Sequence, residues 1–198
     1  MNNLAEGVKK FHRDVHPWNR GLFEKLADGQ SPHTLFITCG DSRIAPCLLT
    51  QSEPGELFVV RNAGNLVPRA EGDATGEQAS IEFAVTALGV KRAVICGHSS
   101  CGAMAGLLNP ARVEGVPLVD SWLRHARPVL ERINPQTVTI EEAAKANVLV
   151  QLENLRTLPP AAAAVDKGEL ELIGWYYDIR SGVVEQYNAD SGKFAAIG

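Results

Sequence analysis

Two stretches of the chain decide its fold: LFITCGDSR at residues 35–43 and AVICGHSSCG at residues 93–102. Each begins with a short apolar run, which is typical of a strand buried on both faces of a sheet. Each run leads into small, polar and metal-binding residues. Further apolar runs at residues 57–60, 170–177 and 183–187 predict three more strands.

Segments with helical spacing lie between these strands. Thr75 and Gln78 resemble a capping box at the start of a helix that runs to about residue 88, and Gly89 is suited to end it. Helical spacing also marks residues 47–51, 101–108, 118–131 and 139–157, the last with an apolar face of Leu149, Leu152, Leu155 and Leu158. Strands that alternate with helices predict an α/β fold with a mostly parallel central sheet flanked by helices. A hairpin signal at Ser181 and Gly182 makes the last strand antiparallel.

The length of 198 residues suits one domain with a full core, so we expect a single domain over residues 1–198. The first thirty residues predict a helical arm of two short pieces broken near Pro17. This arm carries an apolar stripe of Phe11, Trp18, Leu22, Phe23 and Leu26. The stripe belongs either to the core or to a contact with a partner subunit.

Composition excludes several classes of partner. The net charge is −4 and no basic block is present, so nucleic acid is not an expected partner. No apolar run reaches the length of a membrane span, and the first residues lack the apolar stretch of a secretory signal. We therefore expect a cytoplasmic protein without a membrane partner. In that reducing compartment the four cysteines are expected to be buried, metal-bound or reactive rather than paired as disulfides.

The segments that follow the first and third predicted strands carry the chemistry. Ligands bind beyond the carboxyl ends of parallel strands, where the strand order switches sides, so these two segments should be neighbours in space. One contains Cys39, Asp41 and Arg43, and the other contains His98 and Cys101.

Zinc suits this set of residues, because it accepts both thiolate and imidazole ligands. Cys39, His98 and Cys101 would supply three ligands, and a catalytic zinc site keeps its fourth position open. Asp41 has two interpretations: it is the fourth ligand, or it pairs with Arg43 and stays off the metal. Residues i and i+2 of an extended backbone point to the same side, which favours the pair. Held in this way, Asp41 can accept the proton of a zinc-bound water and fix its orientation.

These motifs resemble the β-class carbonic anhydrases. CGDSR at residues 39–43 and GHSSCGA at residues 97–103 resemble the two zinc motifs of that family. PGELFVVRNAGN at residues 54–65 and LIGWYYD at residues 172–178 resemble two further family segments. The resemblance extends from about residue 20 to about residue 190.

The resemblance implies a zinc enzyme that reversibly hydrates carbon dioxide to bicarbonate and a proton through a zinc-bound hydroxide. It implies that Cys39, His98 and Cys101 are the zinc ligands and that Asp41 and Arg43 form a catalytic dyad. It also implies a homodimer or a dimer-based higher oligomer, with the N-terminal helical arm on the neighbouring subunit and the active-site cleft at the interface.

Gln51 and Gly102 are the expected substrate-binding residues. In open-site members of the family, a glutamine at the position of Gln51 donates to the substrate oxygen. Allosteric members lack it and carry a tryptophan and a glycine where this chain has Phe36 and Thr38, so we expect an open site. The backbone near Gly102 is expected to help orient carbon dioxide. Gly40 departs from the serine or alanine commoner in the family, but it is also small.

Two rival functions remain at this stage. A hydrolase of carbon disulfide or carbonyl sulfide would use the same zinc residues and differ only in the shape of its tunnel. A non-catalytic zinc module would have a closed four-ligand site and no need for Arg43 or Gln51.

The other cysteines and histidines are given structural roles. Cys96 is expected to be a core residue, and Cys47 to have no catalytic role. His125 is expected to be structural, whereas solvated surface positions are expected for His12, His16 and His33.

Overall fold

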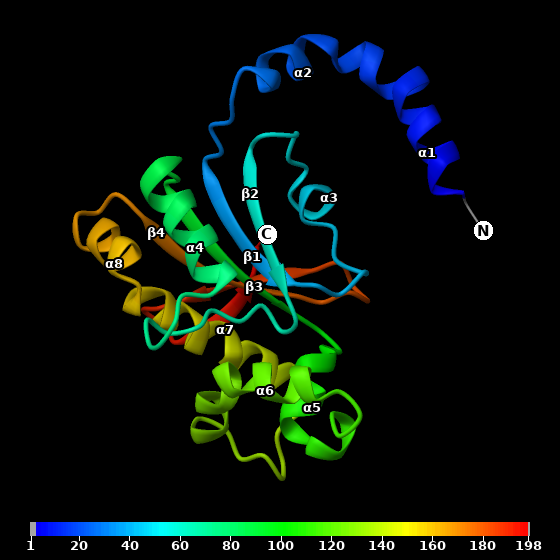
Figure 1. Cartoon of the computed structure of the whole chain (residues 1–198). Coiled ribbons are helices and arrows are strands. Elements are labelled where there is room, and N and C mark those ends of the chain that lie inside the picture. Colours follow the sequence, from blue (N-terminus) through cyan, green and yellow to red (C-terminus); the bar gives the residue numbers. More distant parts are fainter. Residues whose placement is uncertain (1–2, 198) are drawn as a thin grey trace. The chain divides into compact units, whose positions relative to one another are not determined.

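A computed structural model describes residues 3–197 and divides into two compact units that meet between Ser31 and Pro32 (Figure 1). The N-terminal unit consists of helix α1 (Leu4–Lys10), π-helical segment η1 (Phe11–Val15), 3-10 segment η2 (His16–Asn19) and helix α2 (Arg20–Ala27). The predicted break near Pro17 is confirmed, because Pro17 lies in η2 between the two α-helices. No side chain is buried between residues 3 and 31, and Leu4 and Trp18 are each 88% exposed.

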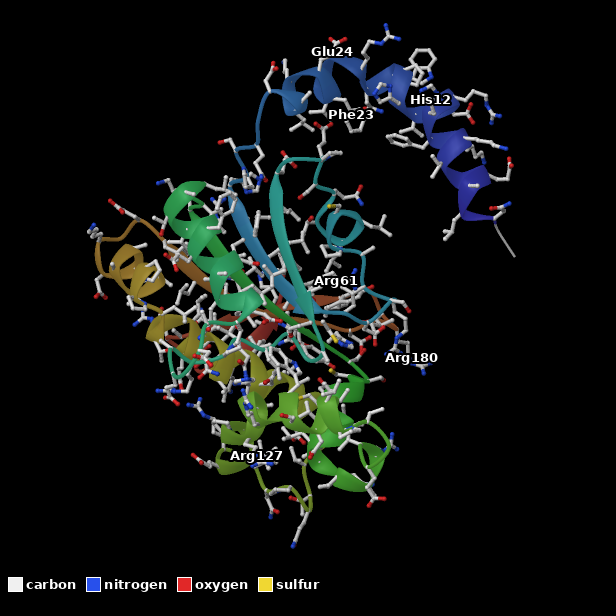
Figure 2. The ribbon with its side chains drawn as sticks, viewed as in Figure 1. His12, Phe23, Glu24, Arg61, Arg127 and Arg180 are labelled. Carbon is white, nitrogen blue, oxygen red and sulfur yellow. The ribbon has the colours of Figure 1, made fainter. Side chains whose placement is uncertain are left out.

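Aromatic contacts hold the N-terminal unit together locally. The ring of Phe23 lies 5.7 Å from that of Phe11, edge to face, and 5.1 Å from that of His16, stacked. His12 stacks on His16 in turn, and Figure 2 shows His12 and Phe23 on these helices. These contacts join η1, η2 and α2 to one another, although no side chain of residues 3–31 is buried.

The second unit is built on a six-stranded sheet with the order β2-β1-β3-β4-β5-β6. Its strands are β1 (Thr34–Cys39), β2 (Leu57–Asn62), β3 (Arg92–His98), β4 (Glu171–Tyr177), β5 (Val184–Asn188) and β6 (Lys193–Ala196). Strands β2, β1, β3 and β4 run parallel to one another, whereas β5 pairs antiparallel with β4 and β6 pairs antiparallel with β5. The predicted α/β class, with a mostly parallel sheet and an antiparallel end, is confirmed.

Helices connect and flank these strands. They are α3 (Pro46–Thr50), α4 (Gly76–Glu82), η3 (Phe83–Ala87), α5 (Gly102–Leu108), η4 (Pro110–Arg112), α6 (Pro117–Leu123), η5 (Arg124–Glu131), α7 (Ile140–Thr157) and α8 (Pro159–Asp166). The capping box is confirmed: Thr75 Oγ1 accepts from Gln78 N at 3.3 Å, and Gln78 Oε1 accepts from Thr75 N at 2.7 Å. Gly89 ends this helical segment in the left-handed region, with φ of 65°.

Strand β1 is buried along its whole length and contributes to three cores. Leu35 and Ile37 belong to one core, together with Ile95 of β3 and Val148 of α7, and Cys39 belongs to a second, together with Cys101. Phe36 belongs to a smaller core, as expected from the alternation of side chains along a strand. Figure 1 shows α4, α7 and α8 together on one side of the sheet, where residues of all three contribute to the core that contains Leu35 and Ile37.

The structure corrects the sequence prediction at several elements. Helix α8 and strand β6 were not predicted. Pro159 starts α8 at a position where a helix tolerates proline, and β6 is a short edge strand. Residues 124–131 form a 3-10 rather than an α-helix, and Pro128 lies within this segment.

The face of α7 also differs from the prediction. Leu155 and Leu158 are buried, but Leu149 and Leu152 are only partly buried. Three polar residues of this helix are buried instead: Asn147, Gln151 and Asn154. Among residues 3–197, no helix has both the length and the apolar character needed to cross a membrane.

Candidate metal centre and active site

Two neighbouring strands bring Cys39 and His98 together. Cys39 is the last residue of β1 and His98 the last residue of β3, and these strands pair in parallel with Thr38 opposite Cys96. The predicted proximity of these strand ends is therefore confirmed. One detail differs: Cys39 and His98 were predicted to follow their strands, but each is the last residue of its strand. Cys101 lies three residues further on, as the N-cap of α5.

The ligand atoms of Cys39, His98 and Cys101 all lie within 4.8 Å of one another. The three residues are 6%, 0% and 1% exposed. Two sulfur atoms and one imidazole nitrogen thus converge in a place closed to solvent. This donor set is the one that zinc accepts.

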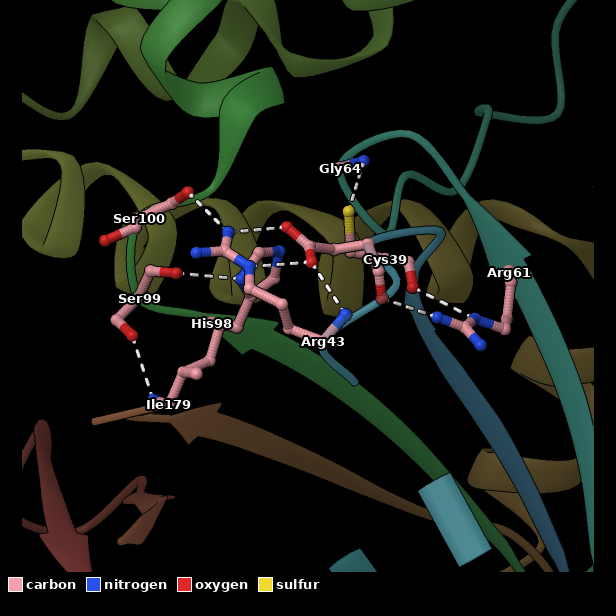
Figure 3. A network of polar contacts seen from close by, with 9 residues as sticks. Cys39, Arg43, Arg61, Gly64, His98, Ser99, Ser100 and Ile179 are labelled. Atoms are coloured by element: carbon pink, nitrogen blue, oxygen red, sulfur yellow. Dashed lines mark hydrogen bonds and ion pairs between the residues drawn. The ribbon is translucent and has the colours of Figure 1, made fainter. Parts of the chain in front are cut away.

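The imidazole of His98 is oriented for a metal. Its Nδ1 lies 2.9 Å from the backbone oxygen of Ser99 and donates to it, which leaves the lone pair on Nε2 (Figure 3). Nε2 is buried and has no hydrogen-bond partner within residues 3–197. A buried nitrogen without a partner costs about 1–3 kcal/mol, and a metal ion would remove this cost. A backbone hydrogen bond to the distal nitrogen is also the usual support of a metal-binding histidine.

The two thiols depend on each other electrostatically. A hydrogen bond from the Cys101 thiol, helped by the Gly64 N–H, lowers the pKa of Cys39 to about 4 against the effect of burial. The same contact and burial raise the pKa of Cys101 above its usual range. The site by itself thus stabilises one thiolate and opposes a second. A divalent cation would stabilise both, so the residues fit Zn²⁺.

Asp41 and Arg43 form a forked ion pair beside these ligands. Arg43 donates from Nε to Asp41 Oδ1 at 2.9 Å and from Nη2 to Oδ2 at 2.7 Å (Figure 3). Arg43 Nη2 also donates to the carbonyl oxygen of Ser100 at 3.2 Å, which joins the segments after β1 and β3. These hydrogen bonds from Arg43 hold the pKa of the Asp41 carboxyl well below its usual range.

Arg61 is a second arginine at this site, and the sequence reasoning did not single it out. It lies near the end of β2, next to β1 (Figure 2). It donates from Nε to Cys39 O at 3.1 Å and from Nη2 to Asp41 O at 2.8 Å. Arg61 therefore fixes the backbone that carries the first ligand and the carboxylate. The one sequence feature that could have indicated its role is its position within the segment at residues 54–65 that resembles the family.

A serine fixes the segment after β3. Ser99 N donates to Tyr177 O at 2.9 Å, and Ser99 Oγ accepts from Ile179 N at 2.9 Å (Figure 3). The carbonyl that orients His98 is thus attached to the end of β4.

Among residues 3–197, no hydrogen bond joins Gln51 to Cys39, His98 or Cys101. Gln51 follows α3 in the left-handed conformation, with φ of 53°, and its Nε2 donates to Leu48 O at 2.6 Å. Gly102 begins α5, and an added Cβ there would meet nothing within 4 Å. Their roles in substrate binding remain predictions.

The remaining cysteines have different surroundings. Cys96 is fully buried, as predicted, and burial raises the pKa of its thiol to about 12. Cys47 is exposed. Among the histidines, the pKa of His125 is lowered, mainly by burial and also by Arg124.

The chain is similar in sequence to known carbonic anhydrases. The family model described as carbonic anhydrase matches residues 34–184. A protein of Pseudomonas aeruginosa named carbonic anhydrase is 44% identical over all of this chain and 92% of its own length. Another from Synechococcus elongatus is 46% identical over all of this chain and 75% of its own length. The chain belongs to the carbonic anhydrase family.

Solved structures place the chain in the β class of these enzymes. The β-carbonic anhydrase CcaA is 42% identical, with a TM-score of 0.94 over 98% of this chain and 91% of that one. A tetrameric β-carbonic anhydrase of Sordaria macrospora is 34% identical, with a TM-score of 0.77 over 94% of this chain and 93% of that one.

Proposed function

We propose that this protein reversibly hydrates carbon dioxide to bicarbonate and a proton, with a zinc ion held by Cys39, His98 and Cys101. The observation that carries the proposal is the convergence of these three buried ligand atoms within 4.8 Å. The relatives named carbonic anhydrase support the reaction. When zinc is bound in a site with three protein ligands, it lowers the pKa of a water in the fourth position so that hydroxide is available near neutral pH.

Asp41 accepts a hydrogen bond and does not store the proton that the reaction releases. Because Arg43 holds its pKa well below the usual range, the carboxylate stays ionised at any pH near neutrality. An ionised Asp41 offers a fixed acceptor that orients a water or hydroxyl group beside the ligands. The released proton must therefore pass to solvent or to buffer.

Arg43 is the residue that holds this acceptor in place. It binds both oxygens of Asp41 and the carbonyl oxygen of Ser100, so the carboxylate is fixed against both ligand-bearing segments. A two-point contact of this kind restricts both the distance and the plane of the carboxylate. Asp41 and Arg43 thus act as one unit in this proposal.

The site is proposed to be open, which means that Asp41 does not bind the metal. The ion pair with Arg43 occupies both carboxylate oxygens, which supports this arrangement. Gln51 and the backbone at Gly102 are proposed to orient the substrate. Gln51 has its Oε1 and one hydrogen of Nε2 available for such contacts, because its only side-chain hydrogen bond within residues 3–197 goes to Leu48 O.

The assembly is proposed to be a homodimer or a dimer-based oligomer, in which residues 1–30 act as an arm on the partner and residues 1–198 form one functional domain. The exposed apolar side chains of Leu4, Val8 and Trp18 support this role for the arm. One structural relative is itself described as tetrameric. A cytoplasmic location remains a prediction.

The test of the function is stopped-flow hydration of carbon dioxide, with zinc measured on the same purified sample. We expect about one zinc per chain, hydration that disappears when zinc is removed by a chelator, and recovery when zinc is restored. Protein that binds no zinc, or that binds zinc and does not hydrate carbon dioxide, would overturn the proposal. The second result would favour a non-catalytic zinc module.

A further inference from the structure

Helix α7 buries three side-chain amides on one face, and the roles proposed for the site residues do not account for them. Asn147, Gln151 and Asn154 are 1%, 0% and 2% exposed. Their spacing of four and three residues aligns them along the helix. Burying amides is costly unless each is hydrogen-bonded, so their partners explain why they are here.

The partners belong to the loop that follows β2. Asn147 Nδ2 donates to Gly64 O at 2.9 Å, and Asn154 Nδ2 donates to Val67 O at 3.0 Å. Gln151 lies between them: its Nε2 donates to Asn147 Oδ1 at 2.9 Å, and its Oε1 accepts from Val67 N at 2.8 Å and from Asn154 Nδ2 at 3.1 Å. The three amides thus form a continuous ladder that fastens the loop to α7.

Gly64 is the point where this ladder reaches the metal centre. Its N–H donates to Cys39 Sγ at 3.4 Å (Figure 3). Its φ is 84°, and a Cβ on it would lie 2.9 Å from the Cβ of Ala103, close behind Cys101. Gly64 is therefore confined between the first cysteine ligand and the start of α5. Its carbonyl is held from the other side by Asn147.

We propose that Asn147 is a positioning residue of the metal centre, which acts through Gly64 by holding its N–H against the sulfur of Cys39. An N–H···S bond withdraws electron density from a thiolate and fixes its direction, and partners of this outer kind typically change metal affinity by about 10–100-fold. Asn154 makes an equivalent bond to the same loop, but at Val67, three residues further from the sulfur contact. The inference rests on the proposed zinc site.

Two matched variants test this role. Asn147→Leu and Asn154→Leu each remove one buried amide of α7 that binds a loop carbonyl and Gln151, so they should lose similar free energies of unfolding. We expect Asn147→Leu to weaken zinc binding about 10–100-fold in a chelator competition. Asn154→Leu should change it less than about 3-fold, since its loop contact does not involve Gly64.

A spectroscopic readout separates positioning from general stability. Cobalt(II) in place of zinc gives thiolate-to-metal absorption that reports on the sulfur donors directly. We expect this absorption to shift in Asn147→Leu and to match the unaltered protein in Asn154→Leu. Should Asn147→Leu fail to fold, Asn147→Asp and Asn154→Asp replace the pair. Asn147→Asp keeps the acceptor for Gln151 but has no donor for Gly64.

The outcomes distinguish the two proposals. Equal effects of the paired variants on zinc affinity and on the cobalt spectrum, or no effect of either, would overturn the role of Asn147 while leaving the zinc site intact. Failure of the unaltered protein to bind zinc would instead remove the proposed function, and this inference with it.

Discussion

Asp41 and Arg43 are two residues apart and share two side-chain hydrogen bonds, of 2.9 and 2.7 Å. Arg13 and Asp14 form a similar fork in the N-terminal unit, at 2.6 and 2.7 Å. The difference is in the surroundings: the side chain of Asp41 is 16% exposed, whereas that of Asp14 is 41% exposed. The second pair is therefore a built-in control for the first.

Replacing Asp41 by asparagine should reduce turnover by about 100-fold or more. The asparagine side chain is neutral and has only one oxygen, so it cannot bind Arg43 at two points and also orient a water as an anionic acceptor. Zinc content should stay near that of the unaltered protein, since Asp41 is not among the clustered ligands. Stopped-flow hydration and metal analysis of the same sample measure both effects. Asp14→Asn should leave both unchanged, and full activity of Asp41→Asn would refute the role of the carboxylate.

Arg43→Lys tests whether the fork or only the charge matters. Lysine keeps the positive charge but cannot bind both oxygens of Asp41 and the Ser100 carbonyl in one plane. We expect kcat to fall about 10-fold or more with zinc still bound. Arg13→Lys is the matched substitution in the exposed pair and should have no effect. Equal kcat values for Arg43→Lys and the unaltered protein would mean that charge alone suffices.

The cysteines should divide into ligands and core residues. Cys101→Ser is expected to lose most of its zinc during dialysis, because one of three clustered donors is weakened. Cys96→Ala should keep stoichiometric zinc and lose about 1 kcal/mol of stability, because Cys96 packs in the core as a protonated thiol. Metal analysis and urea unfolding compare the two. Retention of zinc by Cys101→Ser with zinc loss from Cys96→Ala would reverse the ligand assignment.

The surroundings of Lys145 indicate that the free energy of unfolding depends on pH. Its Nζ lies 2.6 Å from Glu185 and 2.9 Å from Glu141, and 4.6 Å from the centre of the Tyr176 ring. Burial lowers the pKa of Lys145, but the hydrogen bonds to Glu185 and Glu141 outweigh it, so the pKa is raised from 10.5. The stabilisation is thus complete below the ordinary lysine range and is lost as the pH rises through the raised pKa.

Lys145→Met should accordingly lose about 1 kcal/mol at pH 8, since the Lys145 side chain is 23% exposed and pairs with two carboxylates. The difference from the unaltered protein should shrink above pH 10.5. Urea unfolding at both ends of this range measures it. A difference that does not change with pH would show that packing, not charge, is responsible.

Gln51→Asn tests the proposed contact with substrate. Asparagine tolerates the left-handed conformation, so the backbone at this position should be preserved. Its side chain is one carbon shorter, and the loss of one hydrogen bond to substrate should lower kcat/KM about 5-fold. An unchanged kcat/KM would limit Gln51 to its contact with Leu48.

Much of the site could be predicted from the sequence because its parts are local. Cys39 and His98 end apolar runs that read as buried strands, and parallel strands that are neighbours end at the same edge of the sheet. Cys101 follows His98 by three residues, and Arg43 follows Asp41 by two. Short spacings of this kind leave the backbone few ways to separate the side chains.

Arg61 and Asn147 could not be predicted in the same way. Arg61 is exposed and Asn147 is buried, and in neither case does the neighbouring sequence identify the distant backbone group that the side chain binds. Arg61 reaches Cys39 across 22 residues of sequence, and Asn147 reaches Gly64 across 83. Helix α8 was hidden for a different reason, because two consecutive prolines at residues 159 and 160 read as a break rather than as a start.

The sequence by itself determined the α/β fold, the meeting of Cys39, His98 and Cys101, and the Asp41–Arg43 pair. These follow from apolar periodicity, from the shared edge of neighbouring parallel strands, and from spacings of two or three residues. Only the tertiary structure decided which groups hold those donors in place. Their supports come from β2, from the end of β4 and from α7, and a contact between distant segments exists only once the sheet and its helices have packed. Burial of α7 against the sheet is what turns its amides from surface residues into partners of the loop beside Cys39.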